Sequence, residues 1–362
     1  MPSIISVAEA IPAHILRQDE VMNFARELFS DSFQDIDRLL KAFHNGQIEK
    51  RHFVKGMDWY KTDRTFAEKN NAYIEHAVDL GAQAIQNCLT SNDFLKKQIP
   101  YSEIDAIFYI SSSGIATPSI EARIMNKLAF SEHTKRIPIW GLGCAGGASG
   151  LSRAYEYCLA YPEAKVLVLA VELCSLNFQK GDRSKSNLIA ASLFADGAAC
   201  VLLVGDKADK ASYQKLSYVP SITCVQSTLL QDSLDVMGWD VKNEGMHVVF
   251  SKDIPSLIKR WLRPNVDKFL ESCGIGMNDI SHFIAHPGGK KVIDAYAAAL
   301  NFEAEMTRIP LEVLKQFGNM SSPTVLYVLK QFMCLGRGND YGLLTALGPG
   351  FSSELLLLKW EA

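Results

Sequence analysis

Hydrophobic and polar positions follow two patterns along this chain. In some segments apolar residues recur three and four positions apart, which is the spacing of one face of an amphipathic helix. In others they form short, almost continuous runs bounded by glycine or charged residues, which is typical of strands buried on both faces. The first pattern predicts helices within 19–45, 66–90, 121–130, 148–163, 254–274, 290–300 and 321–335. The second predicts strands within 104–114, 136–143, 164–175, 195–208 and 279–289, and two strands joined by a glycine-rich loop over 341–360.

Two prolines stand inside the predicted helices. Pro264 is expected to break or kink the helix at 254–274, because proline lacks a backbone N–H and its ring clashes with the preceding turn. Pro323 falls in the first turn of the helix at 321–335, where proline is tolerated.

Strands alternate with helices in two successive parts of the chain, which predicts an α/β fold with helices layered against sheet. Each part contains a strand, a turn and a helix followed by a late pair of strands. The polar stretch 206–215 is the best candidate boundary between them. We therefore divide the chain into an N-terminal half, 1–209, and a C-terminal half, 210–362. No literal sequence repeat relates the two halves.

The amino-acid composition mainly excludes classes of function. The 362 residues are 48% hydrophobic and 21% charged, and a net charge of −3 leaves no footprint for nucleic-acid binding. No apolar run reaches the about 18 residues of a membrane-spanning helix, so stable membrane insertion is not expected. The N-terminus lacks the basic region and long apolar core of a signal peptide. We therefore expect a cytoplasmic protein.

Cysteine and histidine spacing gives no sign of a metal site. The eight cysteines are scattered through apolar segments without a CxxC pair, so most are expected to be reduced core residues. Among the eight histidines there is no HExxH motif. No metal and no bound cofactor are expected.

Cys144 stands out because it lies in the stretch "WGLGCAGGASG", between a predicted strand and a predicted helix. The positive end of a helix dipole favours a thiolate, and the glycines would let backbone N–H groups approach a reacting carbonyl. The alternative is an inert thiol in a turn made of small residues for tight packing.

Two further residues are ambiguous when taken alone. His286 in "FIAHPGGKK" ends a strand before a glycine turn, where ligand sites form in α/β sheets, but it could equally be a satisfied core histidine. Asn319 in "FGNMSSPTVL" could cap the following helix or offer its amide to a developing negative charge. Together with Cys144 they form an inventory for joining thioesters: a thiol that accepts an acyl group, and two neutral donors that stabilise an enolate.

At these positions the sequence resembles the chalcone synthase-like family, the type III polyketide synthases, over nearly its whole length. Five ordered motifs carry the resemblance: "GLGCAGG", "LFADGAACVLLVG", "AHPGGKKVID", "FGNMSS" and "LGPGFSSE". The resemblance implies a thiolase fold, in which two αβαβα halves stack in five layers, and a homodimer. It implies that Cys144 carries the starter and growing chain, while His286 and Asn319 hold the malonyl-CoA carbonyl and stabilise the enolate.

The resemblance also assigns residues around the reacting centre. Phe194 would be a gatekeeper between a CoA tunnel and the cavity, and Gly348, Pro349 and Gly350 would form the cyclisation loop. The remaining positions implied for the pocket wall are Thr117, Asn177, Trp239, Val248 and Ser321.

CoA binding is implied at Arg38, Lys41, Gly288 and Gly289. The alternative for the two cations is a solvated helix face. Asn45 stands where plant members of the family carry another cation.

Several pocket positions depart from the plant pattern, and "CAGGASGLSRA" is similar to bacterial members. Val248 stands at a family phenylalanine and would free space, whereas Trp239 stands at a family glycine and would fill it. The resemblance therefore implies a fatty acyl-CoA starter, extension by malonyl-CoA, and release mainly as an alkylpyrone, with an alkylresorcinol as a second product.

Three other functions were weighed against this one. A ketoacyl-synthase III-like enzyme would stop after one condensation and use a carrier protein, but "HPGG" and "GPG" argue against it. A papain-like protease would need the motif C-G-[SA]-C-[WY], which is absent. A scaffold without catalytic activity would not be expected to retain all three reactive residues.

Overall fold

The computed structural model describes residues 1–362 and contains one nine-stranded sheet. The strand order is β11-β12-β13-β8-β1-β7-β6-β4-β5. Five strands come from the first half: β1 (Ser3–Ala10), β4 (Ala106–Ile110), β5 (Lys135–Ile139), β6 (Lys165–Leu173) and β7 (Asp196–Val204). Four come from the second: β8 (Val219–Leu229), β11 (Ile280–Ala285), β12 (Tyr341–Gly348) and β13 (Ser352–Glu361). The two parts of the sheet join where Ser3 of β1 pairs with Ser221 of β8.

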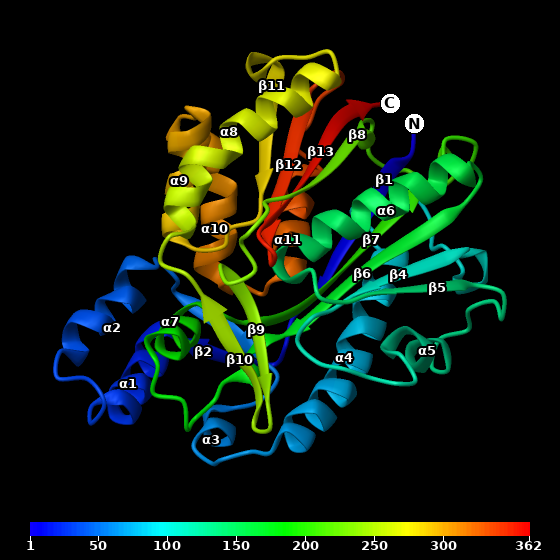
Figure 1. Ribbon diagram of the computed structural model, residues 1–362. Helices are drawn as coiled ribbons and strands as arrows, with labels where there is room; N and C mark the ends of the chain where they lie inside the picture. The colour runs from blue at the N-terminus through cyan, green and yellow to red at the C-terminus, as the bar shows by residue number, and fades with distance from the viewer.

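Helices cover the sheet in layers (Figure 1). The central layer consists of α6 (Gly146–Ala160) and α11 (Ser322–Phe332), whose side chains belong to the largest core cluster. The helix α4 (Phe66–Leu89) covers the outer face of the first part of the sheet. The helices α8 (Ile254–Ser272) and α9 (Lys290–Leu300) cover the outer face of the second part. The order helix–sheet–helix–sheet–helix gives five layers, as expected for the fold.

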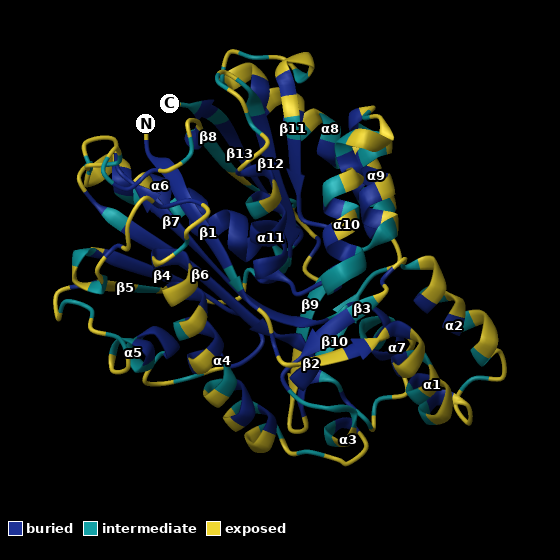
Figure 2. Ribbon diagram, turned by 180° about the vertical axis from the view of Figure 1, so that it is seen from behind, coloured by how far each residue is buried: buried dark blue, intermediate teal, exposed yellow.

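Strand β6 shows why these layers form from this sequence. Its even-numbered residues, such as Val168, pack in the central core, and its odd-numbered residues, such as Leu169, pack under α4. Because both faces are buried, the strand is apolar at nearly every position. Figure 2 shows that the inner strands of the sheet and α11 are buried, whereas the edge strand β5 and the outer sides of α1 and α2 carry exposed residues.

Smaller elements surround this body. Two short antiparallel pairs are β2 (His14–Arg17) with β3 (Lys50–Phe53), and β9 (Met237–Lys242) with β10 (Gly245–Phe250). The remaining helices are α1 (Gln18–Phe29), α2 (Ile36–Asn45), α3 (Met57–Tyr60), α5 (Ile120–Met125), α7 (Lys185–Leu193) and α10 (Arg308–Phe317). No helix is long and apolar enough to cross a membrane.

Most of the predicted elements are confirmed, but two details are wrong. The helix α8 runs without interruption through Pro264. Proline forfeits only one backbone hydrogen bond there, and an apolar face that includes Ile258, Leu262 and Val266 holds the helix against the sheet. The helix predicted over 121–130 ends at Met125, and turns follow it.

The helices and strands not predicted are β1, β8, α3, α7, α10 and the two short strand pairs. The strand β8, "VPSITCVQSTL", mixes polar and apolar residues because its second half is only partly buried, so its pattern resembles a loop. The division at residue 209 remains a prediction; the chain leaves β7 at Val204 and enters β8 at Val219.

Candidate active site

A short 3₁₀ turn, Gly143–Ala145, carries Cys144 between β5 and α6. Gly143 has φ +47°, and a Cβ there would lie 2.8 Å from Cδ of Pro349. A Cβ at Gly147 would lie 2.2 Å from the backbone oxygen of Ser322 at the start of α11. The glycines therefore serve packing, because they let α6 start in contact with α11 and with the β12–β13 loop.

The environment of Cys144 keeps its thiol protonated. Burial, helped by the charge of the nearby Glu172 carboxylate, raises the pKa of Cys144 to about 11, although hydrogen bonding to Ser321 and Asn319 opposes the shift. The sequence suggested that the helix start would favour a thiolate. In the resting protein burial outweighs that effect, so Cys144 needs a base or a bound substrate to become a nucleophile.

His286 follows β11 and is held by its backbone, whose N–H donates to the carbonyl of Thr345 at 2.8 Å. The side chain is 2% exposed, and neither ring nitrogen has a hydrogen-bond partner. Burial lowers the pKa of His286 to about 3, so the imidazole is neutral at physiological pH. It is therefore not a satisfied core histidine; it is a neutral ring with a free donor and a free acceptor.

Asn319 is fixed through both its backbone and its side chain. Its N–H donates to the Leu193 carbonyl at 3.0 Å, and its own carbonyl accepts from the Ala195 N–H at 2.9 Å. Its Oδ1 accepts from the Ser321 N–H at 2.7 Å, and its Nδ2 donates to the Gly288 carbonyl at 3.2 Å. The interpretation of Asn319 as a helix cap is wrong. The N-cap residue of α11 is Ser321, and no side chain forms a capping hydrogen bond there.

The fold brings the three predicted residues to one place. The Sγ of Cys144 lies 4.0 Å from Oδ1 of Asn319. A Cβ at Gly288, whose carbonyl accepts from Asn319, would lie 3.6 Å from Nε2 of His286. Cys144 comes from the first half of the chain, whereas His286 and Asn319 come from the second. The arrangement offers a nucleophile, a neutral imidazole and an amide donor around one small space.

A buried carboxylate beneath this site was not predicted. Glu172 of β6 is 1% exposed and accepts from the Ser112 N–H at 3.0 Å and the Ser322 hydroxyl at 3.0 Å. Burial raises the pKa of Glu172 to about 7. The Ser112 hydroxyl in turn accepts from the Gly143 N–H at 3.0 Å, which joins the carboxylate to the cysteine turn. The signal in the sequence was a single carboxylate inside the apolar run "AKVLVLAVELCS".

Four of the predicted pocket residues line one narrow cavity of about 50 Å³. Phe194 and Trp239 meet there with ring centroids 6.2 Å apart, and Val248 is the cross-strand partner of Trp239. The Asn177 amide donates to the Ser113 carbonyl at 3.0 Å. The other lining residues are mainly apolar: Val21, Phe24, Arg51, Phe53, Met57, Tyr60, Cys174, Ser175, Phe178, Asn187, Ala190 and Ala191.

The remaining predicted pocket residues lie elsewhere around the triad. Ser321 has φ +60° and is buried at the thiol. Gly348 packs against the cysteine turn, since a Cβ there would lie 2.6 Å from the Leu142 carbonyl oxygen. Thr117 precedes Pro118 through a cis peptide bond and does not line the narrow cavity.

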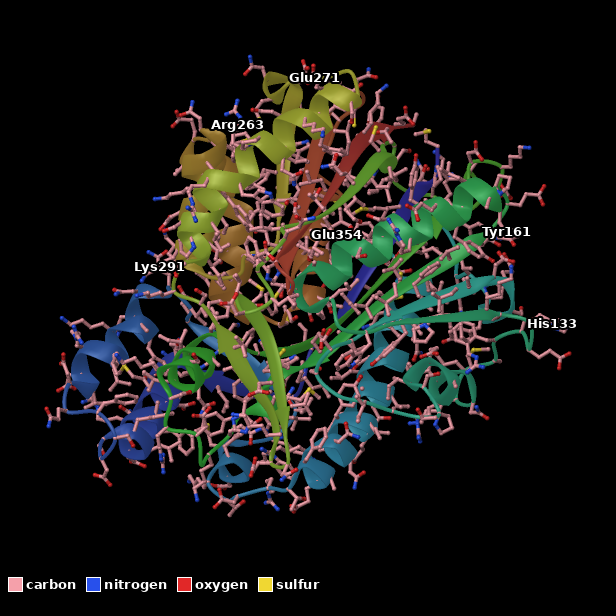
Figure 3. The ribbon with its side chains drawn as sticks, viewed as in Figure 1. His133, Tyr161, Arg263, Glu271, Lys291 and Glu354 are labelled. Atoms are coloured by element: carbon pink, nitrogen blue, oxygen red, sulfur yellow. The ribbon has the colours of Figure 1, made fainter.

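A second cavity, of about 480 Å³, contains all four residues predicted to bind CoA: Arg38, Lys41, Gly288 and Gly289. Asn45 lines it too. Four lysines that the sequence analysis did not single out share the cavity: Lys185, Lys252, Lys290 and Lys291. Figure 3 shows Lys291 on the side of α9 nearest α2. Gly288 connects this cavity to the triad.

Comparison with known proteins places the chain in a family. A family model described as chalcone and stilbene synthases, N-terminal domain, matches residues 2–207, and the corresponding C-terminal domain matches residues 221–360. A Bacillus subtilis protein classed as a candidate chalcone synthase is 53% identical over 100% of this chain and 99% of its own length. The 1,3,6,8-tetrahydroxynaphthalene synthase of Streptomyces peucetius is 31% identical over 99% of this chain and 93% of its own.

Solved structures show the same fold. The 1,3,6,8-tetrahydroxynaphthalene synthase of Streptomyces coelicolor, a bacterial type III polyketide synthase, superposes with a TM-score of 0.89 at 26% identity and covers 99% of both chains. A polyketide synthase from the brown alga Ectocarpus siliculosus superposes with a TM-score of 0.89 at 23% identity, covering 99% of this chain and 98% of its own.

Proposed function

The chain belongs to the chalcone and stilbene synthase family and is a type III polyketide synthase, and we propose that it extends a fatty acyl-CoA starter on Cys144. In the first step Sγ attacks the starter's thioester carbonyl, the bond to the CoA sulfur breaks, and the thiol proton passes to the departing CoA. We assign the transfer of that proton to His286, because its buried ring nitrogens have no hydrogen-bond partner in the protein.

The second step is a decarboxylative condensation. Malonyl-CoA loses CO₂, and the electron pair of the broken C–C bond becomes an enolate on the thioester oxygen. Neutral N–H donors from His286 and the Asn319 amide stabilise that oxygen in a site shielded from water. The enolate carbon then attacks the acyl group on Cys144, and the thiolate leaves. No bound cofactor enters these steps.

One observation carries this proposal: a buried neutral imidazole with both nitrogens free lies next to a fixed amide and a thiol. The test is incubation with radiolabelled acyl-CoA, followed by isolation of the protein. We expect label on Cys144 and none in Cys144→Ala. Undiminished label in that variant would refute the nucleophile.

The proposal of an aliphatic starter is based on the narrow cavity. Its wall is formed largely by Phe24, Phe178, Val248 and Trp239, which suit an alkyl chain. Its volume of about 50 Å³ is far below the roughly 300–1,000 Å³ of typical ligand pockets. A starter with a long alkyl chain would therefore have to displace the Trp239 side chain.

Beyond this cavity the far end of the starter's alkyl chain would reach a larger groove. That groove has a volume of about 950 Å³ and shares Tyr60, Phe178 and Val248 with the narrow cavity. A starter that passes between these three residues would carry its end toward open solvent.

After each condensation the extended acyl group is a thioester of CoA, and it returns to Cys144 by the first step for the next extension. After the last extension we propose ring closure mainly to an alkylpyrone, because attack of an enol oxygen on the thioester carbonyl expels the thiol that carries the acyl group, CoA or Cys144, without a further reactant. An alkylresorcinol is the second product. Mass spectrometry of products from malonyl-CoA and starters of increasing length tests this. A single β-ketoacyl product would instead favour a ketoacyl-synthase III-like reaction.

We further propose a cytoplasmic homodimer. Strand β5 forms the edge of the sheet, and an uncovered edge strand tends to pair with another chain. Trp140 directly after β5 is 54% exposed, and Ile115 in the neighbouring loop is 49% exposed. The Trp140 ring N–H donates to the Gly114 carbonyl at 3.1 Å, so the two lie on one surface. Sedimentation at several concentrations measures the assembly, and a monomer throughout would contradict it.

A further inference from the structure

The groove of about 950 Å³ that adjoins the narrow cavity is lined by charged side chains from three parts of the chain. These parts are α3 with the start of α4, the segment 176–186, and the hairpin β9–β10 with the residues that flank it. Figure 1 shows the hairpin, α3 and one end of α4 at the same end of the molecule. Five lysines or arginines and five aspartates or glutamates line the groove, so individual ion pairs decide where it carries a free charge.

Four of these five cations are exposed or half-buried and already have partners. Three form ion pairs with carboxylates 3.2–3.6 Å away: Arg64 with Glu68, Lys180 with Asp63, and Lys242 with Asp240. Arg183 donates to the Leu28 carbonyl and lies over the Phe29 ring. The fifth cation, Lys69 of α4, is only 7% exposed and forms no ion pair with a carboxylate.

The contacts of Lys69 are neutral. Its Nζ donates to Oε1 of Gln179 at 2.6 Å and to the backbone carbonyl of Glu244 at 3.5 Å. Gln179 is itself held, because its Nε2 donates to the Met246 carbonyl at 3.2 Å. An ammonium has three N–H donors, so one of them is left without a protein acceptor. Two neutral oxygens also do not offset the desolvation of a buried charge as a counterion would.

The carboxylates nearest to Lys69 do not neutralise it. Asp63 pairs with Lys180 at 3.6 Å, and the carboxylate of Glu244 is 68% exposed and lies 3.9 Å from Nε2 of His247. Burial lowers the pKa of Lys69 to about 8, while the charges of Asp63 and Glu244 oppose the shift. The amine is therefore mostly protonated at physiological pH, and the groove contains a fixed positive charge that attracts an anion.

The position of Lys69 restricts what that anion is. The groove and the narrow cavity share Tyr60, Phe178 and Val248, and Gln179, which holds the ammonium, directly follows Phe178. The charge therefore lies in the space that the far end of a starter would enter. A single unpaired ammonium suits a single negative charge, which a carboxylate carries and a phosphate exceeds.

We propose that Lys69 binds a carboxylate at the far end of the starter, so that the enzyme selects the CoA monothioesters of long dicarboxylic acids over methyl-ended acyl-CoAs of equal length. The assignment rests on the proposed function, because it names the end group of the starter that Cys144 receives. The apolar middle of such a starter would occupy the narrow cavity, and its carboxylate would supply the missing counterion.

The test compares two series of starters on the unchanged protein. One runs from hexanedioyl-CoA to hexadecanedioyl-CoA, and the other contains the methyl-ended acyl-CoAs with the same numbers of carbons. We expect the ratio of kcat/KM between the two series to pass through a maximum of about ten-fold at one length, the contribution of a hydrogen bond between charged groups. A ratio at or below one at every length would overturn the assignment.

Variants at Lys69 then locate the origin of that preference. In Lys69→Met the ratio falls by about ten-fold at the best length, while kcat/KM for the methyl-ended starter stays unchanged. Lys69→Arg keeps the charge and retains part of the preference. Equal losses on both series in Lys69→Met, with the ratio kept, would show that Lys69 only supports the fold and would overturn the assignment.

Lys242→Met is the matched control, because Lys242 lines the same groove but is paired with Asp240. Its ratio is expected to change by less than about two-fold. A change equal to that of Lys69→Met would mean that the preference comes from the groove's overall charge, which contradicts a specific site at Lys69.

Calorimetric titration of Cys144→Ala with both series separates this proposal from the proposed reaction. Tighter binding of the dicarboxylic thioesters, lost when Lys69→Met is added, supports the carboxylate site even if no condensation is detected. Equal binding of both series at every length refutes the site and leaves the reaction on Cys144 untouched. If free decanedioate binds as tightly as decanedioyl-CoA, the groove accepts a separate acid, and the assignment to the starter is overturned.

Discussion

Arg51 donates from Nη1 to the backbone carbonyl of Phe194 at 2.7 Å, from a position with no exposed surface. Phe194 forms a parallel bridge with Asn319, and a Cβ at Gly318 would lie 2.7 Å from Cγ of Arg51. One buried side chain thus touches both segments that orient the catalytic amide. Burial lowers the pKa of Arg51 to about 9, and the charge of Asp196 opposes that shift. The guanidinium is therefore a positioning group for the two segments that carry Phe194 and Asn319.

We predict that Arg51→Gln lowers both stability and decarboxylation. Loss of a hydrogen bond from a charged donor costs about 1.5–3 kcal/mol, which urea unfolding measures. Because the Asn319 amide moves, malonyl-CoA decarboxylation falls more than acylation of Cys144. Arg51→Lys keeps a charged donor and should restore part of the rate. Equal loss of both steps in Arg51→Gln would point to general damage.

Substitution of Cys144 by alanine separates the two steps. The thiol is needed to hold the starter, but His286 and Asn319 still surround the space where malonyl-CoA loses CO₂. We therefore expect Cys144→Ala to form no condensation product and to keep converting malonyl-CoA to acetyl-CoA. Liquid chromatography of the CoA esters measures both. Loss of decarboxylation together with condensation would show that the thiol takes part in both steps.

Removal of one N–H donor to the enolate should have the opposite effect to Cys144→Ala: decarboxylation is lost and acylation of Cys144 is kept. Asn319→Ala and His286→Ala each remove an N–H that stabilises the enolate, and loss of one such donor typically costs about 10²–10³ in rate. Decarboxylation falls by that factor, while acyl label on Cys144 persists. His286→Gln, which keeps a neutral donor, is expected to retain more activity than His286→Ala. If the two histidine variants decarboxylate equally slowly, a hydrogen bond from this position is not what matters.

The reactivity of Cys144 depends on Glu172. The carboxylate raises the pKa of Cys144, so Glu172→Gln removes a negative charge and lowers that pKa. At pH 8 more of the thiol is then ionised, and alkylation by iodoacetamide becomes faster. The pH profile of alkylation is expected to shift toward lower pH in Glu172→Gln. A shift toward higher pH would mean that hydrogen bonds lost from the network outweigh the charge.

Trp239 should set the length of the starter. Its ring closes the narrow cavity against Phe194, so Trp239→Ala enlarges that space. We expect the preferred acyl-CoA to become longer by several carbons, read from kcat/KM across a starter series. Val241→Ala, on the exposed far end of the same hairpin, is the control and should leave the preference unchanged. An identical profile in Trp239→Ala would show that chain length is decided elsewhere.

The sequence identified the reacting groups better than their surroundings. Cys144, His286 and Asn319 stand in local motifs, so their chemistry could be inferred before any contact was known. Arg51 and Glu172 could not be assigned, because a charge inside "KRHF" or "VLAVELC" becomes functional only through neighbours from other segments. The protonated state of the Cys144 thiol was missed for the same reason, since burial is a property of the whole fold.

The contact between Gly147 and Ser322 has a consequence for how this protein fails. It joins α6, just after the thiol, to α11, just after the amide, and there is no room for a Cβ between them. The distance from Sγ of Cys144 to Oδ1 of Asn319 therefore depends on how closely α6 and α11 pack. A small loosening of this helix pair would separate the reactive groups while secondary structure remained intact. On heating, catalytic activity should therefore be lost at a lower temperature than the helical signal in circular dichroism.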